Sequence, residues 1–406
     1  MPKMKIATKP KVIEPIPEPI GTARFTGDQL REIADVMRPI CRNGGNLPAL
    51  AHIRIESENS RLTVAASNLD TIAIYRGPDI KPTTGLAAKL LEARHERENG
   101  AFLAPFDSIR QISRAAASAV LTGFWTAGSE RFTVRAEITL PNGQIVADSF
   151  DSLGISEFPL LPEQADLSPE NTVTISESSL TAIRHAMEVS SDDSTRYVLQ
   201  SVAFDGSQDG HHAIIGTDAR RLYQHNSQTF PFNEVRMLPK CQLTSPLVAP
   251  LSSPGWQMDL PPVATENGRV RISAGAWTFH IRCIEGMFPN YRQVIPVQDF
   301  KTTVILTDAA RKDLLATMTK LPSWKSARNV GLVVSAGRCS IRLGNSSIDF
   351  PATVTGEDIA IFFNPEYLAH AFRQGFCHID LIGPETPATF RAGAATLILM
   401  PIRVNV

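Results

Sequence analysis

The sequence predicts an α+β protein made of three similar domains. Three observations support this fold class: the length of the chain, a strand-and-helix pattern that occurs three times, and the hairpins that follow each copy. With 406 residues the chain is too long for one ordinary core, because domains contain about 150 residues on average. We therefore expect a flexible Pro- and Lys-rich tail over residues 1–21, followed by domains over residues 22–165, 166–296 and 297–406.

The first helix of each repeat follows a residue that carries a hydroxyl group. An apolar strand ends at Thr26, at Ser176 and at Thr307, and apolar residues three and four apart come next. A hydroxyl in that place accepts a hydrogen bond from the free N–H groups of the first turn, so the pattern is typical of an N-capped amphipathic helix. Each helix then reaches a methionine, at Met37, Met187 and Met318. The copies lie a domain's length apart, which indicates repeated domains rather than a solenoid.

Two alternating strands and a second helix follow in every repeat. The strand pairs, recognised by a period of two and a polar turn, cover residues 52–56 and 62–66, 201–204 and 213–216, and 332–335 and 340–343. The second helices begin at Pro105, Pro239 and Pro365, since proline suits the first helical turn. We expect the middle one to be short, because Pro246 and Pro250 interrupt it and a proline inside a helix costs about 3 kcal/mol.

Composition excludes several classes of protein. The apolar runs of the chain fall far short of the roughly 20 residues that a membrane-spanning helix needs. Five cysteines occur singly, without a C-x-x-C pair, which favours a reducing cytoplasm and argues against structural zinc and a disulfide framework. The net charge of -1 is not that of an ordinary basic nucleic-acid binder, so any contact with DNA requires another argument.

The sequence gives no support for an enzyme. It contains no phosphate-binding loop, no dinucleotide-binding glycine pattern, and no H-E-x-x-H or G-x-S-x-G motif. His211 and His212 lie in a polar turn without the carboxylate or cysteine spacing of a metal site, so we interpret them as exposed turn residues. Asp192 and Asp193 lie in a loop rich in Ser and Asp, where capping or solvation is the simpler role. We therefore predict no catalytic residue, no metal and no cofactor.

Three short motifs are specific when they are taken together. They are GTDARRL at residues 216–222, EGMFPNYRQVIP at 285–296 and LMPIRV at 399–404. With LP at 47–48 and RYVL at 196–199, their order and spacing resemble the bacterial sliding clamp family, the β subunit of DNA polymerase III, over residues 22–404. Any one motif alone is weak, but their shared order coincides with a threefold repeat that the family also has.

That resemblance implies a fold and a function. It implies three DNA-clamp domains per chain and two chains head to tail in a ring, with helices lining the inside and sheets outside. The homodimer would encircle double-stranded DNA in the cytoplasm, away from any membrane and without catalysis. Its implied partners are the DNA polymerase III α subunit, the clamp loader and other clamp-motif proteins. Because a ring holds DNA topologically, it needs no tight phosphate grip, which suits the near-neutral charge.

The resemblance also implies a hydrophobic groove between the second and third domains that binds the short tails of partner proteins. Its residues are taken where motifs match: Arg196, Leu199, Thr217, Arg221, Leu222, Pro289, Val294, Asn364, Tyr367, Ile398, Leu399, Met400, Pro401 and Arg403. Met400 supplies an adaptable surface, while Arg196 and Arg403 are suited to polar or terminal groups of a peptide.

A different interpretation of several groove residues remains open. Leu222, Val294 and Leu399 would be core residues in almost any fold. Arg221 and Tyr291 would fit a polar network between domains.

Basic residues on the predicted inner helices are the candidates for DNA contact. They lie away from the apolar faces, and they are Arg31, Arg38, Arg42, Arg110, Arg114, Arg184, Lys240, Lys312 and Arg373. Each of them taken singly is explained equally well as part of a solvated helix face. The prediction therefore concerns the whole set.

The chain departs from the family pattern at the groove itself. Ala219 and Arg220 stand where Gly-His is usual, Gln293 replaces a second arginine, and Ala327 lies near a usual aromatic residue. These changes suggest an alternative function, a clamp-like scaffold of a mobile element or repair pathway with altered partner specificity.

Overall fold

The computed structural model describes most of the chain. The described residues are 17–41, 47–58, 61–78, 100–126, 131–162, 172–208, 210–226, 228–248, 256–259, 268–297 and 299–404. They form two compact units. Unit 1 holds the described residues up to Pro162 together with Val248 and Ser273–His280, and unit 2 holds the others.

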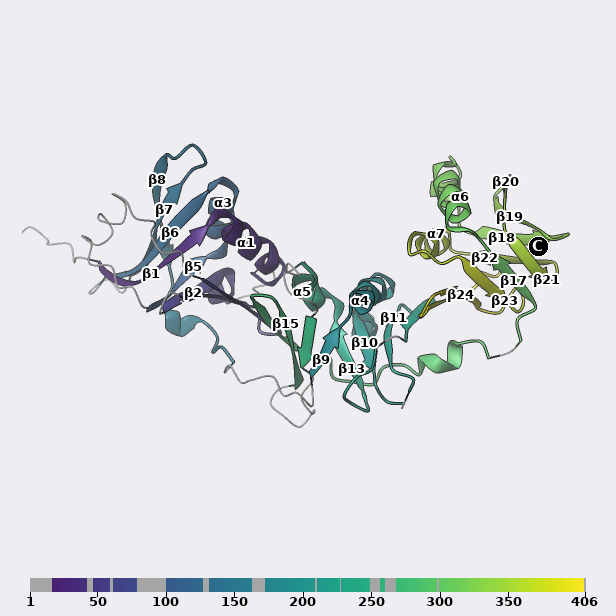
Figure 1. Cartoon of the computed structure of the whole chain (residues 1–406), viewed down its shortest axis with the longest axis horizontal. Helices are drawn as coiled ribbons and strands as arrows, with labels where there is room; N and C mark the ends of the chain where they lie inside the picture. The colour runs from purple at the N-terminus through teal and green to yellow at the C-terminus, as the bar shows by residue number, and fades with distance from the viewer. Residues whose placement is uncertain are drawn as a thin grey trace, which may run out of the picture. The chain divides into compact units, whose positions relative to one another are not determined.

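Unit 1 contains one four-stranded sheet and part of a second sheet, with two helices. The first sheet has the order β1-β6-β7-β8, with β1 (Glu18–Thr26), β6 (Ser118–Thr126), β7 (Arg131–Thr139) and β8 (Ile145–Ser152). Within the second sheet the strands β5-β2-β3-β4 are consecutive, with β2 (His52–Glu58), β3 (Arg61–Ser67), β4 (Thr71–Pro78) and β5 (Gly100–Pro105). Short helices are η1 (Pro48–Ala51) and η2 (Ile155–Glu157). The long helices α1 (Gly27–Cys41) and α3 (Phe106–Ala115) pack side by side (Figure 1).

The first repeat begins as the sequence predicts, with a cap at Thr26. Its Oγ1 accepts from the N–H of Gln29 at 3.0 Å, and the Gln29 side-chain oxygen accepts from the N–H of Thr26 at 2.9 Å. This reciprocal pair is a capping box, which satisfies two otherwise free donors. Ile33 and Met37 are fully buried on the same helix, so the apolar periodicity of α1 does face the core.

Two expected boundaries in unit 1 are wrong by a few residues. Strand β1 begins at Glu18 and pairs with β6, so the predicted tail ends earlier than residue 21. Residues 1–16 of that tail lie outside the described residues. Pro105 precedes the first residue of α3 with an extended backbone (φ -59°, ψ 126°), one position before the first turn.

The middle repeat, most of which belongs to unit 2, repeats the same order of elements. It runs through β9 (Thr172–Ile175), α4 (Glu177–Val189), η4 (Ser194–Gln200), β10 (Ser201–Asp205), β11 (Ala213–Thr217), β12 (Arg221–His225), β13 (Val235–Pro239), η5 (Lys240–Leu243), α5 (Thr244–Val248), β14 (Trp256–Asp259), β15 (Arg269–Ala274), β16 (Trp277–Arg282) and η7 (Tyr291–Val294). Strands β15 and β16 have residues in both units. Ser176 caps α4 through the N–H of Ser179, and α5 is short, both as predicted.

The last repeat lies wholly in unit 2. Its elements are β17 (Thr302–Ile305), α6 (Asp308–Lys320), η8 (Trp324–Ser326), β18 (Val330–Ser335), β19 (Arg338–Leu343), β20 (Ser346–Phe350), β21 (Thr353–Gly356), β22 (Ile359–Phe363), α7 (Pro365–Arg373), β23 (His378–Leu381), β24 (Ala388–Ala392) and β25 (Ala395–Leu399). Thr307 caps α6, and Pro365 occupies the first turn of α7, both as predicted. The α+β fold with three strand-helix repeats is therefore confirmed.

One continuous sheet joins the middle and last repeats within unit 2. Its order is β13-β10-β11-β12-β25-β24-β23-β17-β21. Strands β12 and β25 pair antiparallel, with Arg221 opposite Leu399 and Leu222 opposite Ile398. Helix α4 packs over β11 and β12, while α6 packs on α7. This pairing brings the motifs 216–222 and 399–404 together. The predicted boundary at residue 296 stays a prediction, because both repeats belong to one unit.

None of the helices among the described residues is long and apolar enough to cross a membrane.

Candidate functional site

An apolar hollow of about 170 Å³ lies in unit 2 where the three motifs meet. Eight residues of the predicted groove line it: Leu199, Thr217, Arg221, Leu222, Pro289, Val294, Ile398 and Met400. Three further lining residues were not in the predicted set, and they are Ala219, Asn290 and Tyr291. Ala219 lies in the motif 216–222, and Asn290 and Tyr291 lie in the motif 285–296. Taking every residue of these motifs as a groove candidate would have included all three.

Buried strand residues form the floor of this groove. Leu222 and Ile398 face each other across the β12–β25 pair and are almost fully buried, in one cluster with Phe288 and Tyr291. Val294 remains 37% exposed, so an apolar ligand would remove it from water. The floor is therefore fixed by packing, while part of the rim is free to gain burial energy on binding.

A tight turn between β11 and β12 forms one wall. Ala219 has a φ of 69°, a left-handed conformation that favours glycine. The Asp218 carboxylate accepts from the backbone N–H groups of Arg220 and Arg221, each at 2.9 Å. The Thr217 hydroxyl donates to the Arg221 carbonyl at 2.7 Å and accepts from the Ala219 N–H at 3.1 Å. These bonds hold the glycine-type turn although alanine occupies it.

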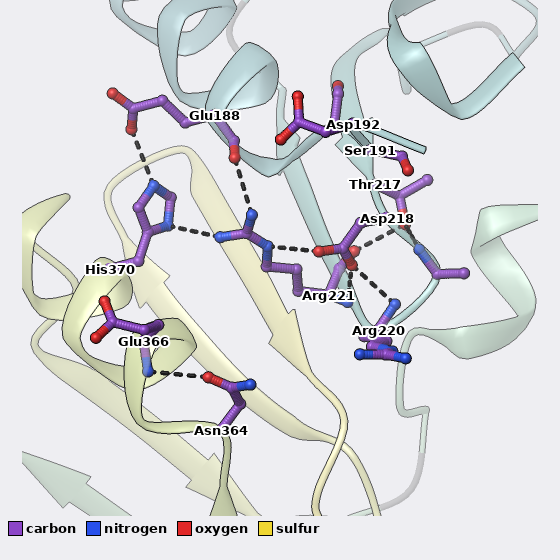
Figure 2. A network of polar contacts seen from close by, with 12 residues as sticks. Glu188, Ser191, Asp192, Thr217, Asp218, Arg220, Arg221, Asn364, Glu366 and His370 are labelled. Atoms are coloured by element: carbon purple, nitrogen blue, oxygen red, sulfur yellow. Dashed lines mark hydrogen bonds and ion pairs between the residues drawn. The ribbon is translucent and has the colours of Figure 1, made fainter. Parts of the chain in front are cut away.

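Each nitrogen of the Arg221 guanidinium has a polar partner beside the groove (Figure 2). Its Nε donates to Asp218 Oδ2 at 2.9 Å, and Nη2 donates to the Glu188 carbonyl at 2.9 Å. Its Nη1 lies 3.3 Å from His370 Nδ1, and its carbon atom stands 4.5 Å above the centre of the Tyr367 ring. Arg221 thus contributes to the groove wall, and its charge serves the joint between α4, β12 and α7.

His370 and Glu188 complete that joint (Figure 2). His370 Nε2 lies 2.9 Å from Glu188 Oε2, which also accepts from the Gln374 amide at 3.0 Å. Burial lowers the pKa of His370, and the nearby Arg221 charge acts in the same direction against the hydrogen bond with Glu188. Burial alone would raise the pKa of Glu188, but the hydrogen bonds with Gln374 and His370 outweigh it, and that pKa is lowered.

Six predicted groove residues do not line the hollow. Leu399 is fully buried within the sheet and acts as packing, the alternative interpretation given above. Asn364 caps α7 by accepting from the Glu366 N–H at 2.9 Å. Tyr367 supports Arg221, and Pro401 is partly buried just beyond Met400.

The other two, Arg196 and Arg403, have largely exposed side chains. Arg196 has only a loose ion pair with Asp193 at 3.8 Å, and Arg403 one with Glu385 at 3.6 Å. Both keep their charge available near the surface. Backbone bonds tie down the segment before Arg403, since Met400 N–H donates to the Arg220 carbonyl at 3.0 Å and Ile402 N–H to the Phe362 carbonyl at 2.7 Å.

A second, more polar hollow of about 510 Å³ shares Pro289, Asn290 and Tyr291 with the groove. At its base the fully buried Asp205 accepts from the Tyr291 hydroxyl at 2.8 Å and from Arg292 at 2.6 Å. Burial and this carboxylate raise the pKa of Tyr291. These hydrogen bonds fix the segment that carries Pro289 and Val294. The motif 285–296 is therefore anchored to Asp205 on β10.

The predicted DNA-facing residues are mostly paired with carboxylates. Arg31, Arg38 and Arg110 each pair with an aspartate three residues earlier, Lys312 with Asp308, Arg373 with Glu366 and Lys240 with Asp192. Arg114 and Arg184 are exposed, and Arg42 lies outside the described residues. Hydrogen bonds from Lys312 and Arg311 lower the pKa of Asp308 to about 2. The pairs are those of a solvated helix face, and DNA contact stays a prediction.

The residues considered for chemistry have structural roles. Asp193 caps η4 through the Thr195 N–H at 3.0 Å, and His212 Nδ1 accepts from the Phe230 N–H at 2.8 Å. In the part of the chain that the structure describes, no three His, Cys, Asp or Glu side chains are grouped to hold a metal ion.

Known proteins place this geometry in context. No protein-family model matches the chain. The chain is similar to the beta sliding clamp of Chlamydia muridarum, with 22% identity over 384 residues that cover 88% of this chain and 92% of the relative. It is also similar to the beta sliding clamp of Synechococcus elongatus, with 25% identity over 250 residues that cover 59% of this chain and 64% of the relative.

Solved structures give the same picture at the level of the fold. A DnaN sliding clamp from Bartonella birtlesii bound to griselimycin matches with a TM-score of 0.75 and 18% identity, covering 95% of this chain and 100% of that chain. The DNA polymerase sliding clamp from Bacillus subtilis matches with a TM-score of 0.74 and 18% identity, over 95% and 100% of the two chains. The chain therefore has their fold over nearly its whole length.

Proposed function

Because the chain is a divergent member of the bacterial β sliding clamp family, we propose that it is a non-catalytic processivity factor. In this proposal it encircles duplex DNA in the cytoplasm and tethers a DNA polymerase III α subunit, a clamp loader and other partners. The observation that carries the proposal is the groove in unit 2, where eight residues from four separate stretches of sequence surround one apolar hollow.

The groove suits a short peptide with apolar anchors. Its lining offers Leu199, Val294 and Met400 to a ligand above a packed floor. Each large apolar side chain that it buries contributes about 1.5 to 3 kcal/mol. Two or three such anchors, less the cost of ordering the peptide, give roughly micromolar affinity. Partners bound in this way exchange quickly, as a clamp that serves several enzymes requires.

The exposed arginines near the groove extend this argument to polar parts of the peptide. Arg196 and Arg403 have side chains that are 54% and 81% exposed, with only loose ion pairs. A carboxylate on the peptide, either a side chain or a C-terminus, would find a charge-assisted hydrogen bond there. Arg221 has less freedom, because each of its three guanidinium nitrogens already has a polar partner within unit 2.

Two edge strands support a ring of two copies. Among the described residues, β8 in unit 1 and β20 in unit 2 each pair with a strand on one side only. Strand β8 exposes Ile145 and Val146, and unpaired strand edges are templates for another chain. Beside β20, strand β19 exposes Arg338 and Arg342, opposite in charge to Asp148 on β8. A head-to-tail pairing of β8 with β20 of a second copy would satisfy both edges.

Peptide binding tests the groove directly. We expect a fluorescent peptide with Leu and Phe anchors to bind the purified protein, and Met400→Ala to weaken binding about tenfold because a buried anchor contact is lost. Met287→Ala is the matched control, since Met287 is 89% exposed and lies outside the hollow. It should change the affinity by less than about twofold. Absence of binding by the unmodified protein would overturn the tethering role.

The alternative scaffold function differs in which partner is preferred. Ala219 gives the groove a methyl group where glycine is usual, and Gln293 lies in the polar hollow beside it. A panel of peptides that vary at the anchor and at the adjoining polar position distinguishes the two functions. Preference for replicative polymerase tails supports the main proposal, and preference for a different tail supports the specialised clamp.

A further inference from the structure

His370 holds the joint beside the groove in one protonation state. His370 belongs to α7, and only 9% of the residue is exposed. Nδ1 faces Arg221 Nη1 at 3.3 Å, and arginine is always a donor, so Nδ1 must accept. Nε2 faces Glu188 Oε2 at 2.9 Å, and a carboxylate accepts, so Nε2 carries the hydrogen. The Gln374 amide nitrogen also lies 3.1 Å from Nε2, but it donates to Glu188 Oε2, so the carboxylate decides the tautomer. Arg221 and Glu188 together specify the neutral Nε2–H form.

We propose that His370, oriented by Glu188, is a positioning residue for the Arg221 wall of the groove, and that the groove is fully formed only while His370 is neutral. This inference rests on the proposed function, because it concerns the same peptide-binding groove. Glu188 and His370 lie 182 residues apart in the sequence, and Arg221 meets them from a third element. The three side chains therefore couple the groove to the contact between α4 and α7.

Protonation would break this arrangement at a definite atom. A second ring hydrogen on Nδ1 would face the N–H of Arg221, so two donors and two positive charges would meet at one contact. Arg221 would keep its bonds to Asp218 and the Glu188 carbonyl, but it would lose its hydrogen bond with His370. Because the same side chain lines the hollow, its displacement changes the shape of the groove.

The charged groups around His370 favour the neutral form. Helix α4 presents Glu188 and His185, β12 presents Arg221, and α7 itself carries Arg373 and Glu366. From α6, Arg311 donates to the carbonyl of Phe372 on α7. Only Glu188 acts directly to stabilise a protonated ring, and burial opposes it. The pKa of His370 is accordingly lowered, so the neutral form persists at neutral pH and is lost only as the pH falls below the ordinary histidine pKa.

His370→Gln separates the hydrogen bonding of the ring from its titration. A glutamine side chain has one acceptor and one donor group and does not titrate, so it is able to reproduce the neutral pattern. His370→Ala removes both bonds. His378→Gln is the control, because His378 is a partly exposed histidine of unit 2 that pairs with Asp380 and does not line the groove.

The first test is peptide binding at about pH 7.5 and about pH 5, near the two ends of the range in which histidines change charge. We expect wild type and His378→Gln to bind about fivefold more weakly in acid, the factor that one hydrogen bond corresponds to. His370→Gln should bind equally at both pH values, and His370→Ala weakly at both. A peptide with no titratable group keeps the comparison clean. An equal acid loss in His370→Gln would overturn the proposal.

A second readout needs no peptide. The Nε–Hε resonance of Arg221 in free protein should shift between these pH values in wild type and stay in place in His370→Gln. Thermal unfolding at neutral pH verifies that each variant is folded. If wild type binds no peptide while the resonance behaves as expected, the proposed function fails and the positioning role stands. If the wild-type resonance does not move, the positioning role fails whatever the peptide does.

Discussion

At the scale of single residues, Ala219 combines backbone strain with a place in the groove wall. A non-glycine residue with a φ of 69° carries a penalty of about 1 kcal/mol or more. The turn is held by the Asp218 carboxylate and the Thr217 hydroxyl, which accept and donate four hydrogen bonds across five residues. These local hydrogen bonds therefore offset the backbone strain at Ala219.

Ala219→Gly tests this balance. We expect the free energy of unfolding to rise by about 0.5 kcal/mol, because relief of the left-handed strain exceeds the added flexibility of the unfolded chain. Ala316→Gly is the matched control, an exposed position inside α6 where glycine should cost about 1 kcal/mol. Denaturant unfolding measures both. If both variants are destabilised alike, the left-handed turn does not carry the strain assigned to it.

Motifs in the sequence predicted most of the groove for a simple reason. Thr217, Arg221 and Leu222 lie in one continuous stretch, and so do Pro289 and Val294, so a linear pattern is able to identify them. His370 and Glu188 carry no such pattern, because each is an ordinary helix residue until the fold brings them together. Leu399 illustrates the opposite case, since it lies within a motif but its side chain is fully buried and does not line the groove.

At the scale of elements, the signals that are local in sequence were predicted well. The caps at Thr26, Ser176 and Thr307 each act within three residues, so the sequence alone locates three helix starts. The pairing of β12 with β25 could not be predicted in this way. It joins segments from different repeats, and no periodicity within either strand specifies its partner. Strand β1 also begins earlier than expected, because Pro19 is tolerated near the end of an edge strand.

Three elements of unit 2 carry buried or half-buried histidines that make stability depend on pH. His185 on α4, His225 on β12 and His370 on α7 all have lowered pKa values, with burial as the first cause. The folded protein therefore binds fewer protons than the unfolded chain in mild acid. Their contribution is fully present above the ordinary histidine pKa of 6.5 and is lost as the pH falls from there through the lowered values.

We expect the melting temperature to fall between about pH 7.5 and about pH 5.5, a range above that in which carboxylates titrate. His225→Gln should flatten this dependence. His211→Gln is the control, because His211 is exposed and should leave the slope unchanged. A melting temperature that is constant over the range, or a slope insensitive to His225→Gln, would contradict the role of the buried histidines.

At the scale of the whole molecule, positive and negative charges are nearly balanced. The net charge is -1, and most of the predicted inner-helix cations are paired with a neighbouring carboxylate. Exposed ion pairs of this kind contribute little to stability but leave few free charges for phosphates. Retention on DNA would then depend on closure of the ring, which in turn depends on the strand edges.

Replacing Ile145 and Val146 with lysine tests that closure. Like charges and lost apolar contact at the edge of β8 should convert the dimer to monomers and abolish retention on circular DNA. Leu160→Lys is the control, since Leu160 is 93% exposed in unit 1 but lies outside the sheet. Sedimentation reports the mass, and loading on circular against linear DNA reports retention. A wild-type protein that is monomeric at micromolar concentration would exclude the ring.

The sheet shared by the middle and last repeats has a mechanical consequence. Five consecutive residue pairs join β12 to β25, from Arg221 with Leu399 to His225 with Ala395. Pulling these repeats apart would require the rupture of a strand ladder, which yields all at once rather than bending like a hinge. A ring built from this chain would therefore behave as a stiff arc at that position. Opening such a ring would require separation at interfaces other than the β12–β25 pair. The groove beside that pair would therefore keep its shape in an open ring.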